Sequence, residues 1–397
     1  MTGRSASGSP GEVFLAALRL GLTSFGGPIA HIGYFRREYV DRRGWLDESS
    51  FGDLVALSQS LPGPASSQLG IAIGTRRAGM LGGIAAWTGF TLPSAIAMTA
   101  IGLFATGTDL TGAGWVHGLK AVTVAVVAQA VWTMSRSLTP DWPRRFVAIV
   151  AAAVALLWTT PFSQVAIIAA GGVIGLLLLA PAPAAPTVSE ASPISRSSGA
   201  VCLALFAALL ITVPLLRTAG GQPVALFDAF YRAGALVFGG GHVVLPLLHS
   251  SVVDPGWVSD DQFLAGYGAA QAMPGPLFTF SAYLGTVSGV PPNGVPGAVV
   301  ALVAIFLPSF LLIFGALPFW EELRQSVGLR RALTGINAAV VGILLAALYT
   351  PVWTSGIEAP IDVAIAAGGL VLLLTGRVPP VVVVGLAALV GATAVGR

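Results

Sequence analysis

Long runs of apolar residues, separated by short polar loops, make up almost the whole chain. Most of these runs approach the roughly 20 residues that a helix needs to cross a bilayer, although 146–159 and 361–375 are short. They predict an all-α polytopic membrane protein with roughly 10 to 13 full spans. The apolar runs are 13–35, 52–75, 79–105, 114–135, 146–159, 161–180, 200–216, 225–248, 262–287, 295–319, 332–350, 361–375 and 378–395.

The composition agrees with this pattern and narrows the class of protein. Hydrophobic residues make up 55% of the chain and charged residues only 9%, whereas a soluble domain has about 25% charged residues. The single cysteine, Cys202, excludes an intrachain disulfide and a cysteine metal cluster. The net charge of +3 is spread over short loops and indicates no nucleic-acid partner.

A series of short motifs occurs twice, in the same order and at a nearly constant separation of roughly 210–220 residues. This indicates an internal duplication, with an N-terminal repeat at 11–180 and a C-terminal repeat at 222–397. Residues 181–221 form a linker with one extra apolar helix, 200–216. The matched motifs are Arg19 with Arg232, Phe25-Gly26-Gly27 with Phe238-Gly239-Gly240, Trp45 with Trp257, Gln59 with Gln271, Pro62-Gly63-Pro64 with Pro274-Gly275-Pro276, Gly74 with Gly285, Leu92-Pro93-Ser94 with Leu307-Pro308-Ser309, and Gly118 with Gly335.

The two Pro-Gly-Pro motifs lie inside apolar runs and cannot continue a helix, since proline lacks an amide donor. A break at membrane depth leaves backbone groups without partners, and it is tolerated only where protein or a water-filled cavity receives them. We therefore expect the two breaks to face each other and to build a substrate site. The alternative is that both are ordinary helix kinks.

The loop charges predict that the two repeats lie upside-down to each other. Loop 36–45 carries four arginines and loop 75–78 carries two, whereas the matched loops 249–261 and 287–294 carry three aspartates and no charge. Basic loops face the cytoplasm. Because basic loops flank 52–75 on both sides, this segment is predicted to be a re-entrant hairpin with Pro-Gly-Pro at its tip. A full span broken at that motif is the alternative.

Several residues near the breaks are candidates for binding an anion. Free N–H groups at a helix start attract anions, and the segments after the two breaks place hydroxyls there. Two arginines lie at matched positions inside apolar runs, where a charge usually has a task. The alternatives are hydroxyls bonded back to the helix and arginines that pair with Glu12 or Asp228 or snorkel to the surface. The candidates are Arg19, Arg232, Gln59, Pro62, Gly63, Pro64, Ser66, Ser67, Gln271, Pro274, Gly275, Pro276 and Thr279, with Phe25, Gly26, Gly27, Phe238, Gly239 and Gly240 as hinges or points of close backbone approach.

The chain has no nucleotide-binding loop, nucleophile elbow or metal motif. We therefore expect no enzyme activity, no cofactor and no bound metal, which leaves a secondary transporter or a channel. His31, His242 or Asp53 could titrate and couple transport to protons. A packed or interfacial histidine is the alternative.

Phe25-Gly26-Gly27-Pro28, Leu61-Pro62-Gly63-Pro64, Arg76-Arg77-Ala78-Gly79, Phe238-Gly239-Gly240-Gly241-His242 and Pro274-Gly275-Pro276 resemble the chromate ion transporter family in its two-domain, long-chain form. The resemblance covers nearly the whole chain. It implies a multi-pass protein of the bacterial inner membrane that exports chromate from the cytoplasm and confers resistance.

The expected function is therefore export of an oxyanion, most simply chromate, coupled to protons. The alternatives are a transporter or channel for a sulfate-like oxyanion, and a flippase or enzyme acting on anionic lipid phosphates. The expected partners are the anion, protons and the lipid bilayer. A homodimer is left open.

Overall fold

The computed structural model describes residues 8–107, 114–158, 160, 163–181, 192–217 and 219–394, and no strand occurs among them. The all-α prediction is confirmed. Within these residues, five helices are long and apolar enough to cross a membrane, and several shorter apolar helices accompany them. The five are Ala65–Gly107, Gly114–Leu138, Arg196–Leu216, Gly294–Gln325 and Val327–Gly356.

The helices follow one another in two similar series, joined by α8 (Arg196–Leu216). The first series is α1 (Pro10–Thr23), α2 (Gly27–Phe35), η1 (Arg36–Arg42), α3 (Glu48–Ser60), α4 (Ala65–Gly107), α5 (Gly114–Leu138), α6 (Trp142–Leu157) and α7 (Ser163–Leu178). The second is α9 (Gly221–Leu236), η2 (Gly241–Val243), α10 (Val244–Leu248), η3 (His249–Val253), α11 (Asp260–Gln271), η4 (Leu277–Thr279), α12 (Phe280–Val287), α13 (Gly294–Ala316), η5 (Leu317–Phe319), α14 (Trp320–Gln325), α15 (Val327–Ala347), η6 (Leu348–Trp353), α16 (Thr354–Gly356), α17 (Pro360–Leu374) and α18 (Pro380–Ala394).

Matched capping residues begin the helix that precedes each Pro-Gly-Pro motif. The Asp47 side chain accepts a hydrogen bond from the Ser50 amide at the start of α3. At the start of α11, Ser259 and Gln262 form a capping box. Each cap stands two residues after the repeated tryptophan, Trp45 or Trp257. The duplication thus extends to the groups that start these helices.

The chain reverses inside α4, which consists of two helices. The backbone leaves the helical conformation at Ala78 and Gly79. Gly74 then packs so closely on Gly82 that a Cβ on Gly74 would collide with the Gly82 carbonyl oxygen. In the second series, Gly285 of α12 packs against Gly297 of α13 in the same way. The reversal falls between the apolar runs 52–75 and 79–105.

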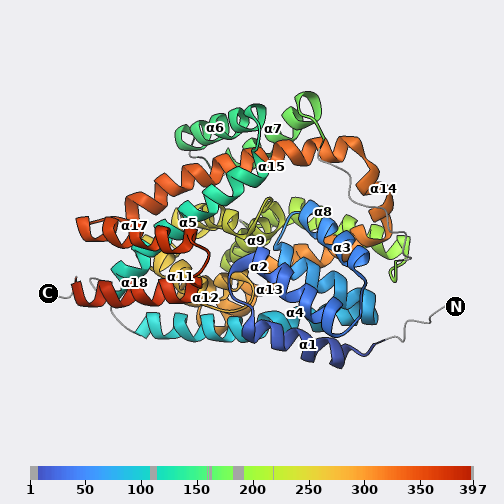
Figure 1. Ribbon diagram of the computed structural model, residues 1–397, viewed down its shortest axis with the longest axis horizontal. Helices are drawn as coiled ribbons and strands as arrows, with labels where there is room; N and C mark the ends of the chain where they lie inside the picture. Colours follow the sequence, from blue (N-terminus) through green and yellow to red (C-terminus); the bar gives the residue numbers. More distant parts are fainter. Residues whose placement is uncertain are drawn as a thin grey trace.

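The last two helices of each series pack against the other series. α17 and α18 lie along α5, while α6 and α7 lie along α15, as Figure 1 shows at the left and at the top. Backbone contacts between small residues hold both pairs together, with Gly118 against Ala387 and Gly335 against Gly171. The two series therefore form one interlocked bundle of helices.

The helices α4 and α13, one from each series, contact each other. Trp87 of α4 makes edge contacts with Phe306 and Phe310 of α13, at centroid distances of 5.5 and 5.4 Å. α1 packs on α4, and α9 packs on α13. Burial of these aromatic rings contributes strongly to the stability of the core.

α8 leaves most of its apolar side chains uncovered. Gly199 packs near the Gly315 carbonyl of α13, while Ile211 and Leu215 are 64% and 73% exposed. An apolar helix with such a surface fits contact with lipid. Residues 182–191 of the expected linker lie outside the described residues.

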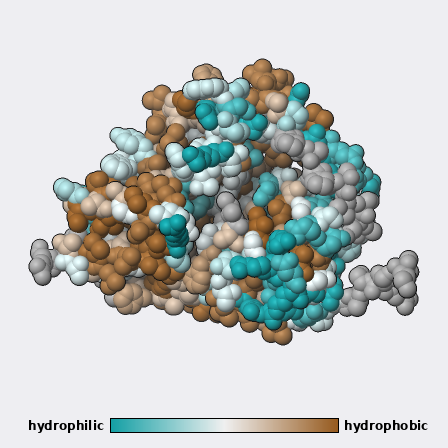
Figure 2. Space-filling view, in the orientation of Figure 1, coloured by the Kyte–Doolittle hydropathy of each residue, from teal (hydrophilic) through white to brown (hydrophobic). Residues whose placement is uncertain are grey.

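The surface polarity is uneven. Figure 2 shows hydrophilic residues gathered at the lower right, where α1, α3 and the first part of α4 lie, and hydrophobic residues at the left, over α17 and α18. The uncovered apolar side chains of α18 include Val382 and Leu389. This distribution agrees with a multi-pass membrane protein that has a polar corner.

Candidate functional site

Each Pro-Gly-Pro motif makes a hydrogen bond to the other series. The Gly63 amide donates to the Val237 carbonyl oxygen at 2.7 Å, and the Gly275 amide donates to the Ser24 carbonyl oxygen at 2.9 Å. Val237 and Ser24 directly precede the two Phe-Gly-Gly motifs. Each Pro-Gly-Pro break is thus hydrogen-bonded to the chain just before the Phe-Gly-Gly break of the other series. These bonds give partners to amide and carbonyl groups that lie outside a regular helix.

The two motif glycines also lie against a serine of the other series. A Cβ on Gly63 would be 2.9 Å from the Ser309 Oγ, and a Cβ on Gly275 would be 2.9 Å from the Ser94 Oγ. Both glycines have positive φ, 128° and 92°. The close approach and the backbone conformation both require glycine. Both serines belong to the repeated Leu-Pro-Ser motif. The repeat is visible in the sequence, but its contact with the Pro-Gly-Pro glycines could not be predicted from it.

The chain returns on itself at both Pro-Gly-Pro motifs. Asp53 near the start of α3 lies 3.6 Å from Arg76 at the end of the first part of α4. In the second series, the Gly289 amide beyond α12 donates to the Trp257 carbonyl before α11, at 2.7 Å. The two ends of each segment therefore lie together, as a hairpin requires. That these hairpins are re-entrant in a membrane stays a prediction.

A cavity of about 410 Å³ lies beside the joined breaks and takes its lining from both series. We call it the central cavity. Its backbone lining includes Gly26, Gly63, Gly239 and Gly240, all of which the sequence singled out. Ala65, the first residue of α4, also lines it, so this helix starts at the cavity wall. The polar side chains of the lining include Ser58, Gln59, Gln129, Thr133, His242 and Asn337.

Two smaller cavities adjoin the central one. The Gln271 cavity, about 80 Å³, is lined by Gln271 and Gly275 and shares Gly26, Gln129 and His242 with the central cavity.

The Arg330 cavity, about 240 Å³, is lined by Ser60, Arg324 and Arg330 and shares Gln59 and Asn337 with the central cavity. The central cavity thus shares lining residues with the Arg330 cavity and with the Gln271 cavity, so we consider the three in the order Arg330, central, Gln271. We call the three cavities together the cavity path.

Gln129 and Asn337 on this path were not singled out as site residues from the sequence. Both lie on the long helices α5 and α15, far along the chain from the Pro-Gly-Pro motifs. One indication of Asn337 is present in the sequence, which is its place in the repeat: it lies two residues after Gly335, as Lys120 lies two residues after Gly118.

The predicted hydroxyl donors are buried beside the path, but they are not among its lining residues in the described part of the chain. Thr279 donates back to the Pro276 carbonyl at 2.9 Å. Ser66 and Ser67 are 4% and 1% exposed. The Gln68 side chain donates to the Pro62 carbonyl oxygen at 2.6 Å, so this carbonyl of the first Pro-Gly-Pro motif has a hydrogen-bond partner.

The two predicted arginines lie on α1 and α9 and are paired with carboxylates. Arg232 binds Asp228 through two hydrogen bonds, 2.9 and 2.7 Å long, and Asp228 is fully buried. Arg19 has a side chain that is 57% exposed and lies 3.9 Å from Glu38. Neither is among the lining residues of the described cavity path. Pairing of Arg232 with Asp228 was one of the alternatives drawn from the sequence.

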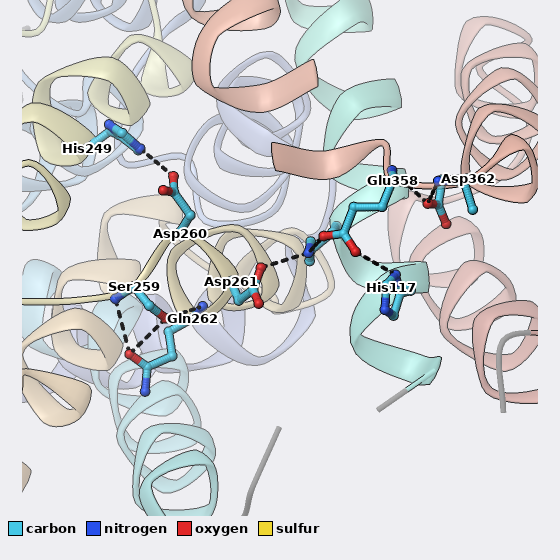
Figure 3. Close-up of polar contacts among 10 residues, drawn as sticks. His117, His249, Ser259, Asp260, Asp261, Gln262, Glu358 and Asp362 are labelled. Atoms are coloured by element: carbon cyan, nitrogen blue, oxygen red, sulfur yellow. Dashed lines mark hydrogen bonds and ion pairs between the residues drawn. The ribbon is translucent and has the colours of Figure 1, made fainter. Parts of the chain in front are cut away.

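A cluster of charged groups joins α5 to α11 and to the segment before α17 (Figure 3). Lys120, whose side chain is only 3% exposed, lies 2.7 Å from Asp261 and also forms an ion pair with Glu358. His117 lies 3.7 Å from Glu358. Lys120 thus has two carboxylate partners, whereas the matched residue Asn337 lines open space in the cavity path.

Beside this cluster, His249 lies 2.8 Å from Asp260, at the start of α11. The hydrogen bond from His249 holds the pKa of the Asp260 carboxyl below its ordinary value. In the described part of the chain, no group of three His, Cys, Asp or Glu side chains is placed to hold a metal ion.

Comparison with known proteins gives relatives along the whole chain. A family model described as "Chromate transporter" matches residues 11–176 and 224–392, which fits two homologous halves. The chain is 30% identical over 377 residues to a chromate transport protein of Pseudomonas aeruginosa, covering 91% of this chain and 86% of that protein.

A second relative, a probable chromate transport protein of Synechococcus elongatus, is 30% identical over 337 residues, covering 83% of this chain and 81% of that protein. The uncharacterized transporter YwrA of Bacillus subtilis is 33% identical over 138 residues, which is 34% of this chain and 75% of that protein. No solved structure matches the chain.

Proposed function

The chain belongs to the chromate transporter family, and from this premise we propose that it exports chromate from the cytoplasm across the bacterial inner membrane in exchange for protons. Such export confers resistance to chromate. The protein acts as a secondary transporter and carries out no chemical step on the anion. The relatives are named as transporters, which supports this class of function.

The observation that carries the proposal is the reciprocal bonding of the two Pro-Gly-Pro motifs beside the central cavity. Its volume of about 410 Å³ lies within the usual range of small-molecule sites. Helix breaks of this kind at the interface of two repeats are where many secondary transporters bind substrate. The arrangement supports a substrate site between the halves.

The lining suits an anion because it offers neutral donors. Gln59, Gln129 and Asn337 contribute amide groups, and α4 starts at Ala65 with its unpaired N–H groups and the positive end of its dipole. In the Gln271 cavity, the side-chain amide of Gln271 adds a further neutral donor. Donors of this kind hold an oxyanion without requiring a carboxylate to be displaced.

The position of the Arg330 cavity supports uptake from the cytoplasm. Asp53 bonds Arg324 at 2.8 Å and lies 3.6 Å from Arg76, so this cavity lies near the basic loop 75–78. Basic loops lie in the cytoplasm by the positive-inside rule. The acidic residues Asp260 and Asp261 support the opposite orientation that we propose for the second half.

His242 is the group that we propose for proton exchange. It lines the central and the Gln271 cavities, and its Nδ1 lies 2.7 Å from the Tyr267 hydroxyl. A histidine on the substrate path can gain or lose a proton as the anion leaves or binds.

Flux measurements in inside-out vesicles test the function. The cytoplasmic face is outward, so we expect chromate to accumulate in the lumen when the lumen is acidic. Accumulation should fall when an ionophore collapses the gradient, and excess sulfate should compete for uptake. Chromate flux no faster than in vesicles without the protein would contradict the function. Flux that ignores the gradient would contradict proton exchange alone.

A further inference from the structure

The Arg330 cavity lies between α3, α14 and α15 at one end of the cavity path. α3 contributes Gln59 and Ser60, and α15 contributes Arg330, Thr334 and Asn337. An anion that reaches the central cavity from this side passes Gln59 and Asn337, because both residues line both cavities. The groups in this cavity therefore meet the substrate first.

The two arginines in this cavity differ in their partners. Arg324 is buried, donates to Asp53 at 2.8 Å and forms an ion pair with Glu321. Asp53 also lies 3.6 Å from Arg76. Two arginines and two carboxylates thus balance one another, and this group leaves no net charge in the cavity.

Arg330 has no carboxylate within ion-pair distance among the residues that the structure describes. Its Nη1 donates to the Arg324 carbonyl oxygen at 2.8 Å, which fixes the plane of the guanidinium. Its Nε is buried and has no hydrogen-bond partner in the described chain. A buried donor on a charged group is costly unless something binds it.

Local helix stability does not explain this arginine. α15 begins at Val327 after the Ser326 cap, so Arg330 lies in its first turn. A positive charge is unfavourable there, because the helix dipole is positive at that end. The helix dipole and the Arg330 charge both make the electrostatic potential in the cavity positive. A bound anion would be stabilised by this potential.

We propose that Arg330 is a recruitment site for a tetrahedral divalent oxyanion, at the cytoplasmic end of the cavity path. This proposal rests on the proposed function. The guanidinium lines the cavity, and two of its N–H groups can match two oxygens of such an anion. The anion then moves on between Gln59 and Asn337 into the central cavity, where neutral donors hold it. The same chemistry fits chromate and sulfate.

The test compares Arg330→Gln with Arg331→Gln in inside-out vesicles. Arg331 is the neighbouring residue with the same charge and an exposed side chain, so it controls for a general change in surface potential. The initial rate of chromate uptake is measured over a range of concentrations, with the amount of protein and its melting temperature checked for each variant. We expect Arg330→Gln to raise KM about tenfold or more, with a smaller effect on kcat, and Arg331→Gln to behave as wild type.

Arg330→Lys keeps the charge but loses the two-pronged donor, and it should raise KM less than Arg330→Gln does. If Arg330→Gln does not fold, Arg330→Lys alone tests the proposal. Wild-type kinetics in this lysine variant would overturn bidentate binding at Arg330. Equal effects of Arg330→Gln and Arg331→Gln would overturn the proposal and leave chromate transport standing. If the wild type moves sulfate but not chromate, chromate export fails, and the same comparison made with sulfate still tests Arg330.

Discussion

The amide of Gly63 donates a 2.7 Å hydrogen bond to the carbonyl oxygen of Val237, across the boundary between the two halves of the chain. The matched bond runs from Gly275 to Ser24 in the reverse direction. Each half therefore completes the broken helix of the other. A change in one motif is expected to act on both halves, because the glycine amide of each motif is paired with a carbonyl oxygen of the other half.

We expect Gly63→Ala to lower stability and to abolish transport. The added Cβ would stand 2.5 Å from Gln68 Nε2 and 2.9 Å from Ser309 Oγ, at a φ of 128°. The backbone strain alone costs about 1–3 kcal/mol. Gly52→Ala is the matched control, because nothing lies within 4 Å of its Cβ position in α3. Melting temperature and chromate flux check the pair, and a Gly63→Ala protein as stable and active as Gly52→Ala would contradict the packing argument.

Much of the architecture could be predicted from the sequence because it depends on local patterns. Apolar runs predict helices, and the break between 52–75 and 79–105 marks the reversal at Ala78 and Gly79. The position of Pro-Gly-Pro between α3 and α4 follows from the chemistry of proline and glycine.

The interlocking of the halves was not predictable in this way. Contact of α5 with α18 depends on Gly118 and Ala387, small residues nearly 270 positions apart whose types do not specify a partner. The partner of Arg232, by contrast, was one of the alternatives drawn from the sequence. The matched position of this arginine suggested anion binding, but the carboxylate four residues earlier on the same helix face, Asp228, already neutralises it.

The role of Arg232 can be separated from that of the ion pair. Arg232→Met leaves Asp228 buried without a partner, so we expect a loss of stability of a few kcal/mol, within the roughly 3–5 kcal/mol typical of broken buried pairs. Replacing both residues, Arg232→Met with Asp228→Leu, should restore most of that stability and the chromate flux. Melting temperature and flux are measured for both variants. A double variant that is stable but inactive would instead assign Arg232 to the anion.

Lys120 gives a second test of a buried charge. In Lys120→Met, Asp261 and Glu358 lose the cation between them, and we expect a lower melting temperature at neutral pH. Adding Asp261→Asn removes one of the two facing carboxylates and should recover part of the loss. If the single variant melts like the wild type, the cluster in Figure 3 does not hold α5 to α11.

The contact between His249 and Asp260 predicts a pH dependence. The folded pKa of Asp260 is depressed by this hydrogen bond. Its contribution to stability is therefore present above the unfolded pKa and is lost as the pH falls through the folded pKa. Asp260→Asn should lower the melting temperature at pH 7, and its effect should diminish as the pH falls through the folded pKa of Asp260. In a His249→Phe background the difference at pH 7 should largely disappear, and its persistence there would assign the effect to another partner.

The sign of the charge on the cavity path can be tested at Asn337, which lines both the central and the Arg330 cavities. Asn337→Asp changes the shape very little but places a negative charge on the route that we propose for a divalent anion. At an effective dielectric constant near 20, each pair of like charges 4 Å apart costs about 4 kcal/mol, so we expect chromate flux to fall by more than about a hundredfold. Asn337→Gln should retain most of the flux. Asn293→Asp, an exposed change at the start of α13, is the control for added charge. Initial rates with equal amounts of folded protein decide between the variants, since an anion that travels elsewhere would leave Asn337→Asp as active as Asn293→Asp.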